Sequence, residues 1–232
     1  METIKYLSRI DLFSGLSEEE LRRLDVATPI CTHEKGAVVA SPHLEAKVLY
    51  LVKSGKVRIY KLTEEGKELT LDILRTGHVF GEMTSFKTRS HMYAVTMEES
   101  IICEIDRQQF REIISKKSEL ALKYIDIVTA RLSEVEEMLE YMAYGSVRKR
   151  LLFLLNKLLG KFGSNHLVDS EWVQLEIAIT HQELASMTGS LRETVTSILN
   201  QLVSEGLVRK EGIRRNYWIH QRRLQDALST CS

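Results

Sequence analysis

Two adjacent charged residues, Arg192 and Glu193, stand at the start of the apolar-periodic stretch RETVTSILNQL. An arginine can donate two parallel hydrogen bonds to O6 and N7 of guanine, and a glutamate can accept one from N4 of cytosine. A helix that only packs against its neighbours does not need such a pair at its exposed start. The simpler alternative is a solvated pair in which Glu193 acts only as a helix cap. The surrounding elements decide between these two interpretations.

The residues around this pair predict two helices joined by a tight turn. Thr180 is followed three residues later by Glu183, which is the spacing of a capping box at the start of a helix. Ser190 and Glu193 repeat that spacing and predict a second start, and Gly189 lies between the two, where a turn needs a residue that tolerates positive φ. This arrangement is a helix-turn-helix, whose second helix enters the major groove of DNA. The expected inward-facing residues are Ala185, Val195, Ile198 and Leu199.

Basic residues surround the predicted helix-turn-helix. SVRKRLLFLLNKLLGKFG reads as an amphipathic helix closed by Gly160 and Gly163, WVQLEIAI is strand-like, and GLVRKEGIRRNYWIH reads as a hairpin with Gly212 in its turn. From Ser146 onward the chain has 12 lysines and arginines against 8 acidic residues, whereas the remainder has 20 against 24. This asymmetry indicates a polyanionic partner for the last third of the chain.

A heptad pattern precedes this part of the chain. Apolar residues recur at alternating spacings of three and four on a helix that we expect from about residue 107 to 144. So narrow a stripe, held over nearly three heptads, favours a two-stranded coiled coil and therefore a two-fold homodimer. The alternative is a single helix packed on its own strands. The residues of the predicted dimer seam are Ile125, Val128, Leu132, Val135, Leu139 and Met142.

Short strands fill the region from about residue 36 to 105. The runs AVVA, VLYLV, KVRIYKL, LTLDIL, YAVT and IICEI are rich in β-branched and apolar residues. Glycines that suit tight turns stand between them, at Gly55, Gly66, Gly77 and Gly81. Many short strands at nearly regular spacing predict a barrel, a sandwich or a roll.

Composition narrows the class of protein. A chain of 232 residues with 44% hydrophobic and 28% charged residues is typical of a globular protein. It has no apolar run of membrane-spanning length and no signal peptide, so we expect a cytoplasmic protein without a membrane partner. Cys31, Cys103 and Cys231 are odd in number and lack metal-site spacing. A catalytic set of Cys103, His78 and Asp72 has nothing that would bring it together, and we do not expect an enzyme.

These stretches resemble the CRP/FNR family of bacterial transcription regulators over essentially the full length. The likeness is carried by ITHQELASMTG and RETVTSILNQLVSEGLV, and by LYLVKSGKVRIYKLTEEGKELTLDILRTGHVFGEM in the region of short strands. The resemblance implies an α+β fold with an N-terminal cyclic-nucleotide-binding-like β-roll that senses an effector (1–106), a long dimerisation helix (107–145) and a C-terminal winged helix-turn-helix (146–232). The implied partners are double-stranded DNA, a second copy of the chain and RNA polymerase.

The resemblance also assigns the DNA contacts. Family members with an Arg-Glu pair at this turn read half-sites such as TGTGA, and they carry a further arginine one turn later, where this chain has Ser197. A serine hydroxyl cannot bind guanine in bidentate fashion, so one base should be read less strictly. A dimer would read an inverted repeat with half-sites about 10 base pairs apart. The expected DNA-binding residues are Thr180, His181, Gln182, Ser190, Arg192, Glu193, Thr194 and Ser197, with Arg209, Lys210, Arg214 and Arg215 of the hairpin on phosphates.

The effector of the predicted roll is left open. In the cyclic-nucleotide binders of the family, a Gly-Glu pair holds the ribose and a later Arg-Ser-Ala holds the cyclic phosphate. Gly81 and Glu82 match the first pair, but the arginine position falls on Met92, which cannot neutralise a phosphate. The adenine-contacting Thr-Ser pair of the family would fall on Val135 and Glu136. We therefore expect an effector other than cyclic AMP, or none.

Haem is the alternative cofactor, because His78, His91, Cys31 and Cys103 lie in or near the predicted roll and both residue types can be axial ligands. Against haem, Cys103 alternates like a buried strand residue and His78 follows a glycine in an exposed turn. The chain also lacks the N-terminal cysteine cluster of the iron–sulfur branch, and we expect no metal site. The candidate effector pocket comprises Gly81, Glu82, Met83, Thr84, Arg89, Met92, Tyr93, Val135 and Glu136.

Overall fold

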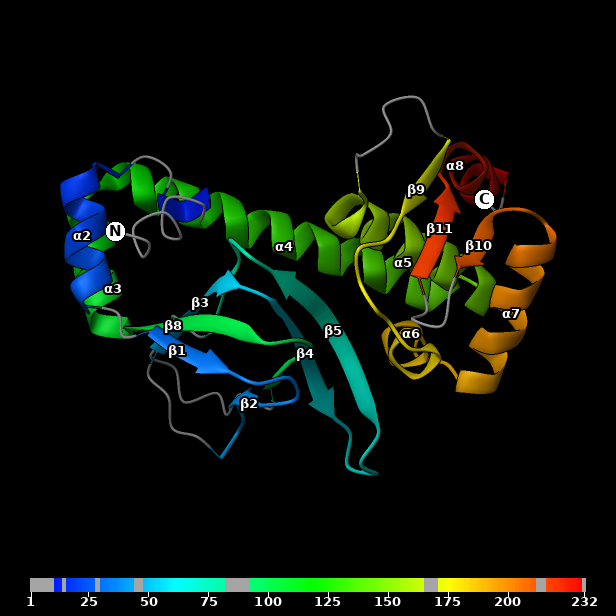
Figure 1. Cartoon of the computed structure of the whole chain (residues 1–232), viewed down its shortest axis with the longest axis horizontal. Coiled ribbons are helices and arrows are strands. Elements are labelled where there is room, and N and C mark those ends of the chain that lie inside the picture. The colour runs from blue at the N-terminus through cyan, green and yellow to red at the C-terminus, as the bar shows by residue number, and fades with distance from the viewer. Residues whose placement is uncertain are drawn as a thin grey trace. The chain divides into compact units, whose positions relative to one another are not determined.

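The computed structural model describes residues 11–13, 16–27, 30–43, 48–81, 92–164, 171–211 and 216–230. Its elements run from η1 to α8, and Figure 1 labels most of them. The chain divides into two compact units, Met1–Leu132 and Ser133–Ser232, and the division falls within one long helix. No helix in the described ranges is long and apolar enough to cross a membrane.

The first unit is built on two four-stranded antiparallel sheets. Their strand orders are β1-β8-β3-β6 and β2-β7-β4-β5. Each of the six predicted strand runs overlaps a strand of the structure, so the prediction of a β-rich first domain is confirmed; β1 and β6 were not predicted. The strands are β1 (Ile30–His33), β2 (Val38–Ala40), β3 (Val48–Ser54), β4 (Lys56–Leu62), β5 (Glu68–Arg75), β6 (Val79–Gly81), β7 (Met92–Thr96) and β8 (Ser100–Asp106).

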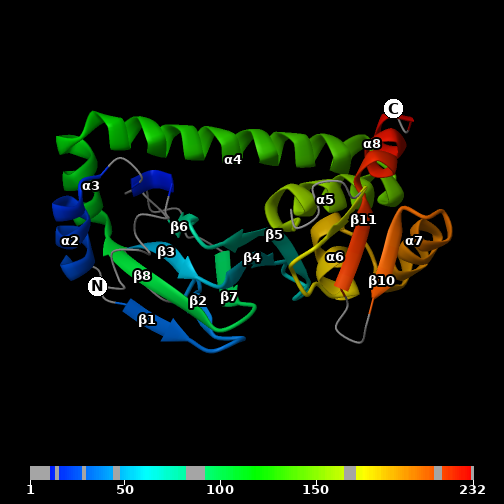
Figure 2. The ribbon, with the colours of Figure 1, turned by 45° about the horizontal axis from the view of Figure 1, so that its top comes forward.

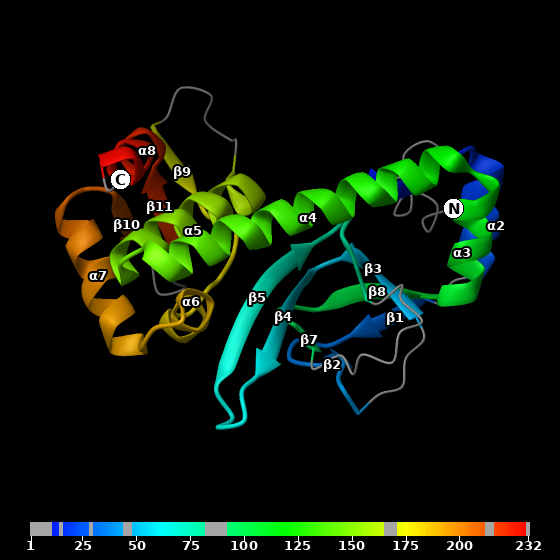
Figure 3. The same ribbon diagram turned by 180° about the vertical axis from the view of Figure 1, so that it is seen from behind.

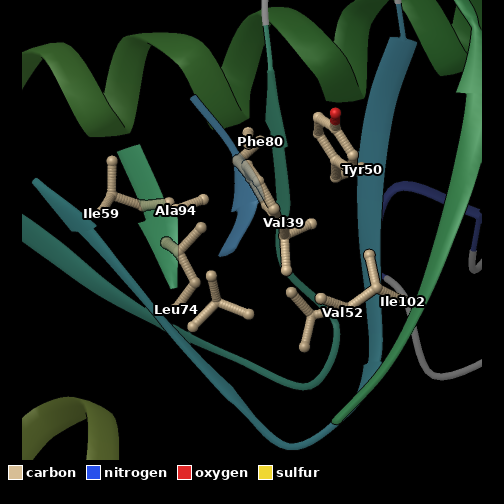
Figure 4. Packing of buried hydrophobic residues seen from close by; sticks show 10 residues of the cluster. Val39, Tyr50, Val52, Ile59, Leu74, Phe80, Ala94 and Ile102 are labelled. Carbon is tan, nitrogen blue, oxygen red and sulfur yellow. The ribbon is translucent and has the colours of Figure 1, made fainter. Parts of the chain in front are cut away.

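Strand β3 is apolar along almost its whole length because its sheet is covered on both faces. Successive side chains of a strand point to opposite faces. Tyr50 and Val52 enter the interior of the roll, where the ring of Tyr50 stacks on Phe80 at 4.8 Å (Figure 4). Leu49 and Leu51 point the other way, into a cluster completed by η1 (Asp11–Phe13), α2 (Glu18–Ala27) and the helices after β8.

Two of the predicted turn glycines show why only glycine fits. Gly55 has φ +93°, and a Cβ there would lie 2.2 Å from the Oγ of Ser100. Gly81 has φ +117°, and its Cβ would lie 2.8 Å from the backbone oxygen of Val48 on the neighbouring strand. Any side chain would therefore force β4 and β6 away from the strands that they approach.

The single helix predicted from about residue 107 to 144 is wrong in one respect, because the chain breaks at Lys117. Helix α3 (Arg107–Lys116) begins at Asp106, whose carboxylate accepts hydrogen bonds from two backbone N–H groups, and it ends where Lys117 adopts an extended conformation. Helix α4 (Ser118–Tyr144) then leaves in a new direction (Figure 2). The break lets Phe110 of α3 and Leu120 of α4 enter the same apolar cluster on the sheet.

Helix α4 has two apolar faces over its first turns. Leu120, Tyr124 and Ile127 pack on the cluster beneath the sheet. The predicted seam lies on another face, and its members Ile125, Val128, Leu132, Val135 and Leu139 are between 47% and 62% exposed. Leu122 is also exposed. These five side chains are therefore not packed on the strands of their own chain, whereas Met142, the sixth predicted member of the seam, is half-buried.

The second unit is a small helical core closed by a three-stranded sheet of order β10-β11-β9 (Figure 3). The helix predicted to close at Gly160 and Gly163 runs through Gly160 and is capped by Gly163, whereas WVQLEIAI forms only a three-residue strand. The predicted hairpin is present as β10 paired with β11, although its tip, residues 212–215, lies outside the described residues. The elements are α5 (Val147–Phe162), β9 (Trp172–Gln174), α6 (His181–Thr188), α7 (Arg192–Ser204), β10 (Val208–Glu211), β11 (Asn216–His220) and α8 (Gln221–Thr230).

Candidate nucleic-acid interface

Helix α6 begins with the capping box that the sequence predicts. The hydroxyl of Thr180 accepts a hydrogen bond from the backbone N–H of Glu183 at 3.0 Å. In return, the carboxylate of Glu183 accepts one from the backbone N–H of Thr180 at 2.6 Å. Two N–H groups that the helix leaves without partners are thereby satisfied, which places the start of α6 firmly at His181.

The turn after α6 is as short as the motif requires. Gly189 caps the helix in the left-handed conformation, with φ 57° and ψ 41°. The N–H groups of Gly189 and Ser190 both donate to the carbonyl oxygen of Ala185, which is completely buried where α6 meets its neighbours. This reversal directs the chain straight into α7.

The second predicted capping box, Ser190 with Glu193, is wrong. Helix α7 begins at Arg192, its cap residue is Leu191, and no side chain caps the N–H groups of its first turn. Ser190 instead completes the end of α6 through its own N–H group. Glu193 is therefore the second residue of α7, too early to act as the third residue of a capping box, and its carboxylate is not used as a cap. The cap role of Glu193 in the alternative interpretation is therefore wrong, and what is left of that alternative is a solvated pair of charges.

Arg192 and the first residues of α6 line one hollow on the surface. It has a volume of about 350 Å³ and is lined by Thr180, His181, Gln182 and Arg192. Gln182, Arg192 and Glu193 are exposed. The structure thus brings together the start of the first helix and the start of the second, which lie about ten residues apart in sequence. Donors and acceptors of both helices face a common space that a nucleic-acid edge can enter.

A hydrogen-bonded chain that sequence reasoning missed connects these two helix starts. Nδ1 of His181 lies 2.7 Å from the hydroxyl oxygen of Thr196, and that hydroxyl donates to the carbonyl of Arg192 at 2.8 Å. Because the single hydroxyl proton of Thr196 is used on Arg192, Nδ1 of His181 must carry a proton and donate. The link sets the rotation of α7 against α6. A histidine and a threonine 15 residues apart give no local signal that could have revealed it.

The hairpin residues expected on phosphates have protein partners of their own. The guanidinium of Arg209 lies over the ring of Trp172 at 3.9 Å, and the ammonium of Lys210 donates to the side chain of Asn200 at 2.9 Å. Asn200 lies on the exposed face of α7 two turns after Glu193, so Lys210 ties the hairpin to the predicted recognition helix. Arg214 and Arg215 lie outside the described residues.

The remaining predicted contacts of this interface lie on α7 and in the turn before it. Ser197 is exposed on α7, one turn after Glu193, whereas Thr194 and Ser190 are half-buried. Along α7, Glu193, Ser197 and Asn200 recur at spacings of four and three and so share one face of the helix. Asn200 was not predicted, but this spacing could have found it.

The candidate effector pocket is only partly described. Gly81 ends β6, and Glu82, Met83, Thr84 and Arg89 lie outside the described residues. Met92 packs against the interior cluster of the roll. Tyr93 is the next residue on β7 and so points to the other face, where it stacks on Tyr60 at 5.2 Å. The side chain of Tyr93 therefore does not point into the interior of the roll.

The structure also describes the helix positions of this pocket and three of the four candidate haem ligands, whereas His91 lies outside the described residues. Val135 and Glu136 are exposed on α4. Cys103 is completely buried, as the alternation of its strand predicts, whereas His78 is half-buried rather than exposed. Cys31 pairs in register with Ile102, so it faces away from Cys103 across the sheet and the two cannot form a disulfide. Within the described ranges no three His, Cys, Asp or Glu side chains gather as a metal site.

Comparisons with known proteins match the two parts of the chain to two different domain families. Residues 31–117 match the model of the cyclic nucleotide-binding domain, and residues 149–225 match the Crp-like helix-turn-helix domain. The chain is 31% identical over 202 residues to the cyclic AMP receptor protein of Thermus thermophilus, covering 85% of this chain and 88% of that protein. It is 27% identical to the probable transcriptional regulator flp of Lacticaseibacillus casei, covering 88% and 89%.

A solved structure shows the same fold over nearly the whole length. A CooA mutant from Carboxydothermus hydrogenoformans superposes with a TM-score of 0.77, covers 94% of each chain and is 23% identical. The cyclic nucleotide-binding model thus matches the first part of this chain and the helix-turn-helix model matches the last part. The Thermus relative aligns with both parts. This chain belongs to the CRP/FNR family of DNA-binding transcriptional regulators.

Proposed function

We propose that two copies of this chain form a homodimer that reads an inverted repeat, with α7 of each copy in a major groove. The observation that carries this proposal is the surface at the start of α7, where Arg192 and Glu193 are exposed beside a hollow lined by the first residues of α6. A recognition helix contacts base edges with its N-terminal residues, which are the residues displayed here. Arg192 would bind guanine and Glu193 would accept from cytosine.

The pairing of two copies is supported by the seam on α4. Five large apolar side chains along one face of this helix are about half exposed in the single chain. A stripe of this length is costly to leave in water, and a second copy of the same helix covers it with two-fold symmetry. Two-fold symmetry in the protein requires two-fold symmetry in the operator, with half-sites about 10 base pairs apart.

The pattern of bases follows from the residues on the exposed face of α7. Ser197 is too short for a bidentate contact with guanine, so the base beneath it should be read less strictly. Arg209 and Lys210 approach the DNA from the hairpin, where phosphates are the nearest groups. Lys210 also supports the helix, because it is bound to Asn200.

We infer that the roll responds to an effector other than cyclic AMP, or to none. The Thermus relative is a cyclic AMP receptor protein, which makes cyclic AMP the natural alternative. Against it, Met92 stands at the position of the phosphate-binding arginine and packs against apolar side chains of the roll interior. A cyclic phosphate placed there would lose its charge-assisted partner. Val135 at the adenine position lies on the exposed seam instead.

The roles of the three segments of the chain and their cellular setting are inferred from the family. Residues 1–106 would form the sensing roll, 107–145 the dimerisation segment and 146–232 the DNA-binding domain. The protein would act in the cytoplasm on the bacterial chromosome and meet RNA polymerase at the promoter. Regulation of transcription, not catalysis, is the role that fits a family of regulators.

Selection of binding sites from random duplexes tests the proposal directly. The wild-type protein should enrich two-fold symmetric sites, and Arg192→Ala should weaken binding by about 1–3 kcal/mol per half-site and relax the preference for one guanine. Arg222→Ala, which removes an exposed arginine of α8 in the same domain, is the matched control and should retain the wild-type profile. Enriched sites without two-fold symmetry, or identical profiles from wild type and Arg192→Ala, would contradict the proposal.

A further inference from the structure

Arg150 lies where three helix ends meet. Its Nε donates to the carbonyl oxygen of Gly145, directly after α4, at 3.0 Å, and its Nη1 donates to the carbonyl oxygen of Thr188, the last residue of α6, at 3.1 Å. Arg150 itself belongs to the first turn of α5. Carbonyl groups at the C-terminal end of a helix lack partners within the helix and carry partial negative charge. One guanidinium, with its donors in a fixed fork, serves both ends at once.

Two apolar contacts hold the same junction. Met142 is the last residue of the seam, and a Cβ built on Gly189 would lie 3.2 Å from its terminal methyl group and 3.9 Å from Nη1 of Arg150. The ring of Tyr141 stacks on Phe153 of α5 with 4.1 Å between centroids. The end of α4 is therefore bound to α5 and to the turn of the helix-turn-helix within a single compact unit.

We propose that Arg150 is a positioning residue that fixes the direction of the recognition helix relative to α4, and with it the half-site separation that the dimer reads. This inference rests on the proposed dimeric function. The two copies pair through α4, whereas the bases are read by α7, which follows α6 after a three-residue turn. A residue that binds the end of α4 and the end of α6 determines how the reading surfaces of the two copies are spaced. Arg150 needs no contact with DNA for this role.

The test compares three variants of the full-length protein. Arg150→Met keeps an unbranched apolar chain but removes both hydrogen bonds, and Arg150→Lys keeps the charge but cannot reach two carbonyl groups with a fixed fork. Arg222→Met is the matched control, because Arg222 is an exposed arginine on α8 of the same compact unit. The duplexes are the selected inverted repeat, the same repeat with one half-site scrambled, and a series with the half-sites moved by one or two base pairs.

The wild type should bind the full repeat far more tightly than the scrambled one and should discriminate sharply among spacings. Loss of two hydrogen bonds from a charged donor should weaken binding of Arg150→Met to the full repeat by about tenfold or more, with less than about threefold change on the scrambled repeat. Its spacing profile should flatten. Arg150→Lys should fall between the two, and Arg222→Met should keep the wild-type profile.

Two results would overturn the role of Arg150 without touching the proposed function. One is an unchanged spacing profile in Arg150→Met, and the other is an equal loss of affinity on the full and the scrambled repeats, which would assign Arg150 to the stability of the DNA-binding unit alone. A wild-type protein that does not prefer the two-fold repeat would instead refute the proposed function, and the role of Arg150 with it. Sedimentation of Arg150→Met should show the same dimer as wild type, since the seam is intact; monomers would also contradict the assignment.

Discussion

Changing the seam on α4 should convert the protein into monomers. Leu132 and Leu139 are 56% and 62% exposed in the single chain. Complete burial of a leucine contributes about 1.5–3 kcal/mol, so covering the remaining surface contributes about 1–2 kcal/mol per side chain, and the four side chains of a dimer together contribute about 4–7 kcal/mol. Glutamate at both positions removes this contribution and places charges in an apolar seam. The dissociation constant of the dimer should therefore rise by at least about a thousandfold.

Sedimentation velocity over a series of protein concentrations measures this change. The control is the variant Ala130→Glu with Ser133→Glu, which adds the same two charges to exposed positions of α4 outside the seam. The control should remain dimeric, and both variants should keep the helical circular dichroism of the wild type. A seam variant that stays fully dimeric, or a control that dissociates as readily, would show that two copies pair through another surface or do not pair in this way.

Three further outcomes are expected. Thr196→Val, which keeps the shape but removes the hydroxyl between His181 and Arg192, should weaken binding to the selected operator by about fivefold in a fluorescence titration, whereas Thr196→Ser should restore it. Calorimetry should detect no micromolar binding of cyclic AMP to the wild type, and tight binding would refute the interpretation of Met92. Burial acts to raise the pKa of Glu134, but the hydrogen bonds and charges of two lysines of α5 outweigh it and the pKa is lowered from 4.5. This carboxylate therefore stabilises the packing of α4 on α5 fully above pH 4.5 and loses its effect as the pH falls through its lowered pKa. The difference in melting temperature between wild type and Glu134→Gln should be present at pH 7 and disappear in acid.

Local signals in the sequence were sufficient for the parts of the fold that depend on near neighbours. The capping box of Thr180 and Glu183 and the turn at Gly189 are determined within ten residues, and both are confirmed. The second capping box failed although its spacing is correct, because the N–H group of Ser190 is used to end α6. In so short a turn the residues that end one helix are not available to begin the next.

Features that depend on distant contacts were not predicted. The apolar period continues on both sides of Lys117, so no pattern marks the break; it arises because α3 and α4 both reach the same cluster on the sheet. Strand β6 is three residues long and is a strand only because it pairs with β3. The links from His181 to Thr196 and from Lys210 to Asn200 are likewise contacts between elements, and such contacts leave no spacing in the sequence.

The excess of basic residues after Ser146 indicated that the last third of the chain binds DNA. In the structure, however, much of this positive charge is used in contacts within the protein. Many of the basic residues after Ser146 are bound within the protein, to carboxylates, carbonyl groups, an amide or aromatic rings; they are Arg148, Lys149, Arg150, Lys157, Lys161, Arg209, Lys210 and Arg223. These cations hold α4, α5 and the hairpin in place around the recognition helix. Because each phosphate neutralised contributes about −0.9 to the slope of log K against log salt, the measured slope should show how many of these cations also reach phosphates. Arg192 is exposed at the hollow, so in this protein the selection of a site should depend more on a few placed side chains than on a broad basic surface.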